Sequence, residues 1–142
     1  MAQDFIAGAS IDINTPIANV WKALIDPETI KQYMFGTSVS SDWGEGSSIT
    51  WEGEWQGRPY ADKGVILQFR PRHLIQYTHF SPLAGLPDDP ENYHTVTIEL
   101  TSEGKHTRLS LSQDNNPTEQ ERDNSQQNWQ AMLTAMKGLL EK

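Results

Sequence analysis

Residues 118–142 of this 142-residue chain read TEQERDNSQQNWQAMLTAMKGLLEK and predict one long helix. Pro117 precedes the stretch, and Thr118 with Glu121 has the S/T-x-x-E spacing of a capping box, so we expect the helix to begin at Thr118. Apolar side chains then recur with the helical period and form a single stripe, made of Trp129, Met132, Leu133, Met136, Leu139 and Leu140. This half of the helix is therefore expected to pack against a core.

The same face of the helix becomes polar toward its N-terminus, where Arg122, Ser125 and Gln126 occupy positions that an apolar stripe would fill. Two interpretations stand. The first turns either extend past the core into water, or they cover a partly hydrated cavity. Packing these groups against an apolar sheet would leave polar atoms without partners. The second interpretation therefore places a cavity at the N-terminal half of the helix, with Trp129 at its border.

The chain before this helix predicts a strand, two short helices and a run of antiparallel strands. Residues 5–13 alternate as a strand, Thr15 and Pro16 should cap and begin a helix, and Asp26-Pro27 should end it and begin another. A short strand is expected around Val39. The remaining strands are expected at 49–55, 60–69, 73–80, 93–102 and 105–115, and Val65, Leu67 and Phe69 should share one face.

This order predicts an α+β domain in which the long C-terminal helix lies across the apolar face of a curved antiparallel sheet. Strands that cluster in the sequence favour a meander over alternating β–α–β units. A helix of this length spans about 35 Å, which is enough to cross the sheet. Residues 81–92 contain three prolines and two leucines, so they are expected to form a mobile loop beside the cavity entrance.

Composition indicates one domain, residues 1–142, and excludes several classes of partner. The net charge of −8 argues against a nucleic-acid surface and against an anionic membrane surface. The chain has no cysteine, no apolar stretch that could span a membrane and no signal-peptide pattern at its start. We therefore expect a cytoplasmic protein without membrane insertion.

Catalytic and cofactor motifs are not found in the sequence. The four histidines, His73, His79, His94 and His106, have no close ligand spacing, and there is no nucleophile elbow, phosphate-binding loop or dinucleotide fingerprint. We accordingly assign no metal, no cofactor and no catalytic residue.

Candidate ligand-binding residues are inward polar groups and aromatic side chains. His94 shares the strand parity of Val96 and Ile98, so it is either a hydrogen-bonded core histidine or a polar group on a cavity wall. Tyr77 and His79 share one face and have the same two interpretations, and tryptophans are more often core residues than ligand-stacking groups. The full candidate set is Trp43, Trp51, Trp55, Tyr77, His79, His94, Gln113, Gln126 and Trp129.

The chain resembles the heat-shock-protein-90 ATPase activator homologue-like domains, a branch of the START-like (SRPBCC) helix-grip superfamily. The matching pieces occur in order along nearly the whole chain: Pro16-x3-Val20-Trp21-x2-Leu24-x-Asp26-Pro27-Glu28, Asp42-Trp43-x2-Gly46-Ser47, Gly64-x-Ile66-Leu67, Leu74-x2-Tyr77-Thr78-His79, Pro90-Glu91-Asn92-Tyr93-His94, Thr107-x-Leu109-x-Leu111-x-Gln113-Asp114-Asn115 and Asn128-Trp129-x3-Leu133-x2-Met136-Lys137. The resemblance implies a sheet that grips the last helix, with two small helices closing one end. It also implies that the space between sheet and helix holds an apolar or amphipathic small molecule.

Three hypotheses for the function follow. The first is a binding module for an apolar or amphipathic small molecule. The second is a cyclase- or hydratase-like enzyme that uses His94, Tyr77 and His79 as acid–base groups. The third is a co-chaperone-like interaction domain with a chaperone as partner. A titrating histidine in a stable cavity favours the second hypothesis, and an exposed apolar patch outside the cavity favours the third.

Overall fold

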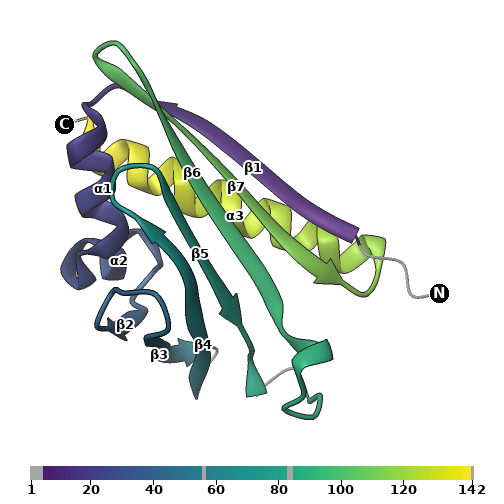
Figure 1. The fold of residues 1–142 in the computed structure, drawn as a ribbon. Coiled ribbons are helices and arrows are strands. Elements are labelled where there is room, and N and C mark those ends of the chain that lie inside the picture. Colours follow the sequence, from purple (N-terminus) through teal and green to yellow (C-terminus); the bar gives the residue numbers. More distant parts are fainter. Residues whose placement is uncertain (1–4, 56, 83–84, 142) are drawn as a thin grey trace.

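The computed structural model describes residues 5–55, 57–82 and 85–141, with the side chain of Trp55 outside this part. The elements follow the expected order (Figure 1). They are β1 (Phe5–Ile13), α1 (Ile17–Ile25), α2 (Pro27–Tyr33), β2 (Ser38–Ser41), β3 (Ser48–Trp55), β4 (Arg58–Arg70), β5 (Leu74–His79), the short 3-10 helix η2 (Pro90–Asn92), β6 (His94–Glu103), β7 (His106–Asn116) and α3 (Glu119–Leu140).

The strands form one antiparallel sheet of seven strands in the order β1-β7-β6-β5-β4-β3-β2. The sheet is strongly twisted, and α3 lies across one face of it (Figure 1). The helices α1 and α2 close the end of the sheet near the C-terminus of α3. This arrangement confirms the α+β helix-grip fold, with two short helices after the first strand. Among the described residues, no helix is both long and apolar enough to span a bilayer.

The two predicted helix caps differ in the structure. Thr118 is the N-cap of α3, and its Oγ1 accepts a hydrogen bond of 3.1 Å from the backbone N–H of Glu121, as the capping box predicts. The prediction for Thr15 is wrong, because Pro16 occupies the N-cap of α1 and the helix begins at Ile17. The Thr15 hydroxyl instead accepts a hydrogen bond from the Asn19 side-chain amide at 2.9 Å.

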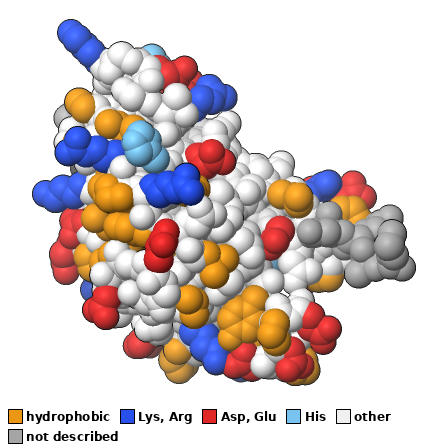
Figure 2. Space-filling model, in the orientation of Figure 1, with side chains coloured by type: hydrophobic (Ala, Val, Ile, Leu, Met, Phe, Trp, Pro, Cys, Tyr) orange, Lys and Arg blue, Asp and Glu red, His pale blue; other side chains and the backbone are white. Residues whose placement is uncertain are grey.

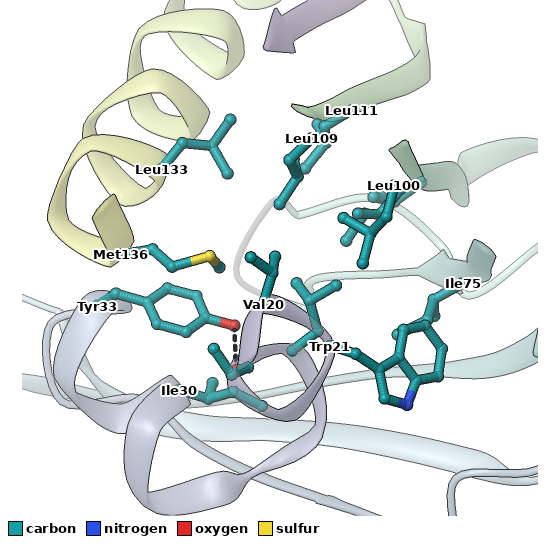
Figure 3. Close-up of a cluster of buried hydrophobic side chains, with 14 of the residues drawn as sticks. Val20, Trp21, Ile30, Tyr33, Ile75, Leu100, Leu109, Leu111, Leu133 and Met136 are labelled. Carbon is teal, nitrogen blue, oxygen red and sulfur yellow. Dashed lines mark hydrogen bonds between the residues drawn. The ribbon is translucent and has the colours of Figure 1, made fainter. Parts of the chain in front are cut away.

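The core lies between the sheet, α1, α2 and the C-terminal half of α3 (Figure 3). Leu133 and Met136 of α3 are 2% and 1% exposed and face Leu109 and Val20. Tyr33 of α2 lies in the same cluster and donates a hydrogen bond of 3.1 Å to the Ala23 carbonyl. Leu133 and Met136 of the apolar stripe are thus core, whereas Trp129, Met132, Leu139 and Leu140 are partly buried and pack against it.

Strand β4 departs from simple alternation. Its register against β5 shifts between Ile66 and Gln68, so one extra residue lies in β4 at this point. Ile66 and Phe69 therefore face inward, and the ring of Phe69 packs 5.2 Å from that of Trp21. Val65 and Leu67 face outward and are 41% and 44% exposed, so the shared face predicted for Val65, Leu67 and Phe69 is wrong.

Candidate functional site

A cavity of about 350 Å³ lies between the N-terminal half of α3 and the chain that links β5 to β6. Most of its lining residues are of polar types and come from separate elements, among them His94 of β6, Asn115 and Asn116 of β7, and Ser125 and Asn128 of α3. Its apolar lining residues are Phe80, Leu86 and Pro117. The sequence predicted a ligand cavity at this half of α3, and that role stays a prediction; Trp129, expected at its border, is not among the described lining residues.

A second cavity in the apolar interior has a volume of about 30 Å³. Trp43, Trp51 and Tyr77 line it together with core side chains of α2 and β5. A space of this size admits a water molecule but is far below the volume of an ordinary organic-ligand site. The core aromatic residues therefore fill the interior of the grip.

A network of buried and partly buried side chains connects α3 to β7 beside the larger cavity. The indole Nε1 of Trp129 donates to Gln113 Oε1 at 2.7 Å, and Gln113 Nε2 donates to Asn116 Oδ1 at 3.2 Å and to Ser125 Oγ at 3.3 Å. Asn116 Nδ2 in turn donates to the backbone carbonyl of Phe5 at 2.9 Å. We call Gln113, Asn116, Ser125 and Trp129 the α3–β7 network.

The α3–β7 network explains the polar face of the first turns of α3. Ser125 is bonded within the network, and Gln126 Oε1 accepts a hydrogen bond of 3.1 Å from the backbone N–H of Gly8 in β1. Arg122 lies 5.7 Å above the ring of Phe5 and pairs with Glu119. These polar groups therefore do not simply extend into water, and only some of them line a cavity. Ser125 lines the larger cavity, whereas Gln126 and Arg122 fasten the helix to β1.

A row of ionisable side chains crosses the inner face of three neighbouring strands beside the larger cavity. His94 of β6 is the register partner of His79 of β5, and their rings stack with centroids 6.2 Å apart. His79 Nε2 lies 2.9 Å from Asp62 Oδ2 of β4, and its ring lies 4.9 Å from that of Trp51. His94 thus lies at the cavity wall, and His79 and Asp62 are the next members of the row toward the aromatic interior.

Tyr77 lies deeper in the interior than the row formed by His94, His79 and Asp62. Its ring packs 5.1 Å from that of Trp51, and burial raises the pKa of its hydroxyl well above the ordinary value. Tyr77 therefore stays protonated near neutral pH and is unsuited to act as a base. Among the described residues, no three His, Asp or Glu side chains are arranged to hold a metal ion.

The chain between β5 and β6 is held by two side chains beside the larger cavity. Asp88 pairs with Lys63 of β4 and accepts a hydrogen bond of 2.6 Å from the Tyr93 hydroxyl. Asn115 Nδ2 donates to the backbone carbonyls of Glu91 and Tyr93 at 2.6 and 3.0 Å. The hydrogen bond from Lys63 lowers the pKa of Asp88. The position of this loop at the cavity agrees with the sequence prediction, while Leu83 lies outside the described residues and the mobility of the loop stays a prediction.

The candidate residues from the sequence thus fall into three places. His94 lines the larger cavity, and Trp43, Trp51 and Tyr77 surround the small one. Gln113 and Trp129 belong to the α3–β7 network, Gln126 contacts β1, and the side chain of Trp55 is outside the described part. Sequence reasoning missed Asp62, although a carboxylate with the inward parity of Gly64 and Ile66 was a usable signal. It also missed Asn116, and although it placed Ser125 on the polar face of α3, it could not predict that the two side chains pair through the tertiary fold.

Comparison with known families settles the relationship of the chain. Residues 14–141 match the family described as activator of Hsp90 ATPase homolog 1-like protein. The chain belongs to this family. The predicted resemblance is thereby confirmed, and the neighbours among solved structures share the START-like fold. None of the curated proteins compared with the chain matches it.

Several solved structures are similar to this family member over their whole length. The solution structure of ChR145 from Cytophaga hutchinsonii has a TM-score of 0.86 and 55% identity, covering 99% of this chain and 96% of that one. Protein CV1439 from Chromobacterium violaceum has a TM-score of 0.79 and 23% identity, with 97% and 98% covered. CalU16 from Micromonospora echinospora has a TM-score of 0.71 and 19% identity, with 100% and 87% covered. The last two similarities concern the fold alone.

Proposed function

We propose that this domain binds an amphipathic small molecule in the cavity between the N-terminal half of α3 and the β5–β6 loop. The observation that carries the proposal is the volume of about 350 Å³ at a place where the helix is held by hydrogen bonds instead of close apolar packing. Pockets for small organic molecules begin at about 300 Å³ and combine apolar walls with a few placed polar groups.

The distribution of side chains gives the ligand an orientation. Phe80, Leu86 and Pro117 offer an apolar surface, and His94 with Ser125 and Asn128 offers hydrogen-bonding groups. A ligand with one apolar and one polar part satisfies both kinds of surface, whereas a purely apolar molecule would desolvate the polar lining without replacing its hydrogen bonds. The proposed site therefore includes His94 and excludes the closed interior around Trp43, Trp51 and Tyr77.

A second candidate function is acid–base catalysis on a molecule in the same cavity. The pairing of His79 with Asp62 at 2.9 Å favours it, because a carboxylate fixes the orientation of an imidazole that transfers protons. Mass spectrometry separates this candidate from simple binding: a ligand that is recovered chemically changed after incubation supports catalysis, and an unchanged ligand supports binding. A chaperone partner and a cytoplasmic location stay predictions.

The test of the binding proposal uses the neutral fluorescent probe N-phenyl-1-naphthylamine. Asn128→Trp places a large ring in the lining of the cavity, and Gln130→Trp places the same ring at an exposed position of α3 outside the lining. We expect the unsubstituted protein and Gln130→Trp to bind the probe alike, and Asn128→Trp to bind at least about tenfold more weakly. Equal binding by all three proteins would contradict the proposed site.

A further inference from the structure

The row of ionisable side chains beside the larger cavity, His94, His79 and Asp62, presents hydrogen-bond acceptors. His94 Nδ1 lies 2.8 Å from the backbone carbonyl oxygen of Asp114. A carbonyl oxygen only accepts, so Nδ1 carries the proton of the neutral ring and Nε2 carries a lone pair. No described residue forms a hydrogen bond with this Nε2 atom. His94 therefore brings an unmatched acceptor to the wall of the larger cavity.

The same reasoning fixes the tautomer of His79. Its Nε2 lies 2.9 Å from Asp62 Oδ2, and a carboxylate only accepts, so the neutral ring holds its proton on Nε2 and its lone pair on Nδ1. No described residue forms a hydrogen bond with Nδ1. The other carboxylate oxygen, Asp62 Oδ1, is buried and also has no hydrogen-bond partner among the described residues. Three acceptor atoms in one row thus receive no hydrogen bond from the described part of the chain.

The charges around the cavity have the same sign. Glu91 and Glu121 are among its lining residues, and no lysine or arginine of the described chain is. The two nearby cations are already paired, Lys63 with Asp88 and Arg122 with Glu119 and Asp123. On the face drawn in Figure 2, lysine and arginine gather mainly toward the end of the sheet with the β6–β7 hairpin, opposite the start of β6 where His94 lies. An anionic ligand would therefore meet both unmatched acceptors and like charges.

From the unmatched acceptors and these charges we infer that the polar part of the ligand is a protonated amine. Its N–H groups donate to His94, and His79 and Asp62 lie behind His94. The inference rests on the proposed binding function. An alkylammonium group carries three N–H donors, a positive charge and no acceptor, so it matches both features. A carboxylate or phosphate matches neither, and a quaternary ammonium supplies the charge without the donors.

The test compares four compounds that share a decyl chain and differ in the polar group: decylammonium, decanol, decyltrimethylammonium and decanoate. Each displaces N-phenyl-1-naphthylamine from the protein at about pH 8, where free imidazole groups are neutral and alkylammonium groups are charged. We expect decylammonium to bind at least about tenfold more tightly than decanol and decyltrimethylammonium, and decanoate to bind most weakly. Decanoate or decanol binding as tightly as decylammonium would overturn the inference.

Two variants, each of which lacks one negative charge, sharpen the test. Asp62→Asn removes the carboxylate behind His79, and we expect it to reduce the preference for decylammonium over decanol by about fivefold or more. Glu99→Gln removes a charge from the exposed face of β6 and should leave the preference unchanged. A thermal melt shows whether each variant is folded, and the head-group series on the unsubstituted protein decides the question if Asp62→Asn is not. An unchanged preference in folded Asp62→Asn would also overturn the inference.

The possible failures of the two proposals are distinguishable. If the probe binds in the cavity but the four compounds show no preference for the amine, the amine inference fails and the binding site stands. If neither the probe nor any of the four compounds binds, the proposed function fails, and the inference fails with it.

Discussion

Trp129 shows how one side chain can belong to a core and to a polar network at the same time. Its ring packs partly against the apolar cluster, while its Nε1 donates to Gln113 at 2.7 Å. The helical period predicted the position of Trp129 on the stripe, at the border where the stripe becomes polar. Periodicity carries no information about a hydrogen-bond partner 16 residues earlier, so the bond to Gln113 could not be predicted.

Gln113 is the residue on which the α3–β7 network depends. Its side chain accepts from Trp129 and donates to Asn116 and Ser125, so Gln113→Leu leaves several polar groups without partners. We expect the substitution to lower the free energy of unfolding by about 2–4 kcal/mol, measured with urea. Gln130→Leu, at an exposed position of the same helix, should change it by less than about 0.5 kcal/mol. A similar loss in both variants would show that the network does not stabilise the fold.

At the scale of elements, local patterns predicted the strands and helices well and their irregularities poorly. Alternation in β6 and β7 correctly placed Val96, Ile98 and Leu109 inward. The extra residue in β4 was not predicted, because an irregular strand can look alternating until its partner strand is known. Gly64 of β4 lies where the backbone of β5 approaches closely, because a Cβ added to it would lie 1.7 Å from the Thr78 carbonyl oxygen.

The stripe of α3 is expected to supply much of the stability of the fold. Leu133→Ala removes a side chain that is 2% exposed, and it should lower the free energy of unfolding by about 2–5 kcal/mol. Leu67→Ala is the matched control, since Leu67 is 44% exposed on the outer face of β4, and it should cost less than about 1 kcal/mol. Denaturant midpoints of the two variants test the difference. Equal midpoints would contradict the packing of α3 on the core.

The β5–β6 loop should respond to pH through Asp88. Its pKa lies below the model-peptide value of 3.8 because Lys63 and Tyr93 donate hydrogen bonds to the carboxylate. The folded loop therefore binds fewer protons than the unfolded one. The stabilising contribution of Asp88 is fully present above the unfolded pKa of 3.8 and is lost as the pH falls through the lower folded pKa.

Amide hydrogen exchange of residues 85–93 tests whether Asp88 holds the loop above its pKa. Asp88→Asn should speed exchange in the loop at neutral pH, where the unsubstituted protein keeps the pair between Asp88 and Lys63. Asp89→Asn, one residue away and exposed, should leave the exchange unchanged. If the two variants exchange alike, Asp88 does not hold the loop.

For the whole molecule, the sequence predicted the fold, whereas the lining of the larger cavity depends on tertiary contacts. The polar half of α3 indicated where apolar packing ends. The lining came from residues whose proximity depends on the tertiary structure, such as Asn116 of β7 and Ser125 of α3. Trp51 and Tyr77 lie in the core, which is one of the two interpretations that the sequence left open for them, because side chains that converge on a common interior fill it unless something holds the elements apart.

The central claim is that a small amphipathic molecule binds under the N-terminal half of α3. Titration of the isotope-labelled protein with decylammonium, followed by backbone amide chemical shifts, tests it most directly. The account predicts saturable shift changes that cluster at His94, Asn116, Ser125 and Asn128, with no comparable change at Leu67 on the outer face. Shift changes centred on the outer face of β4, or no saturable change at any amide, would contradict it.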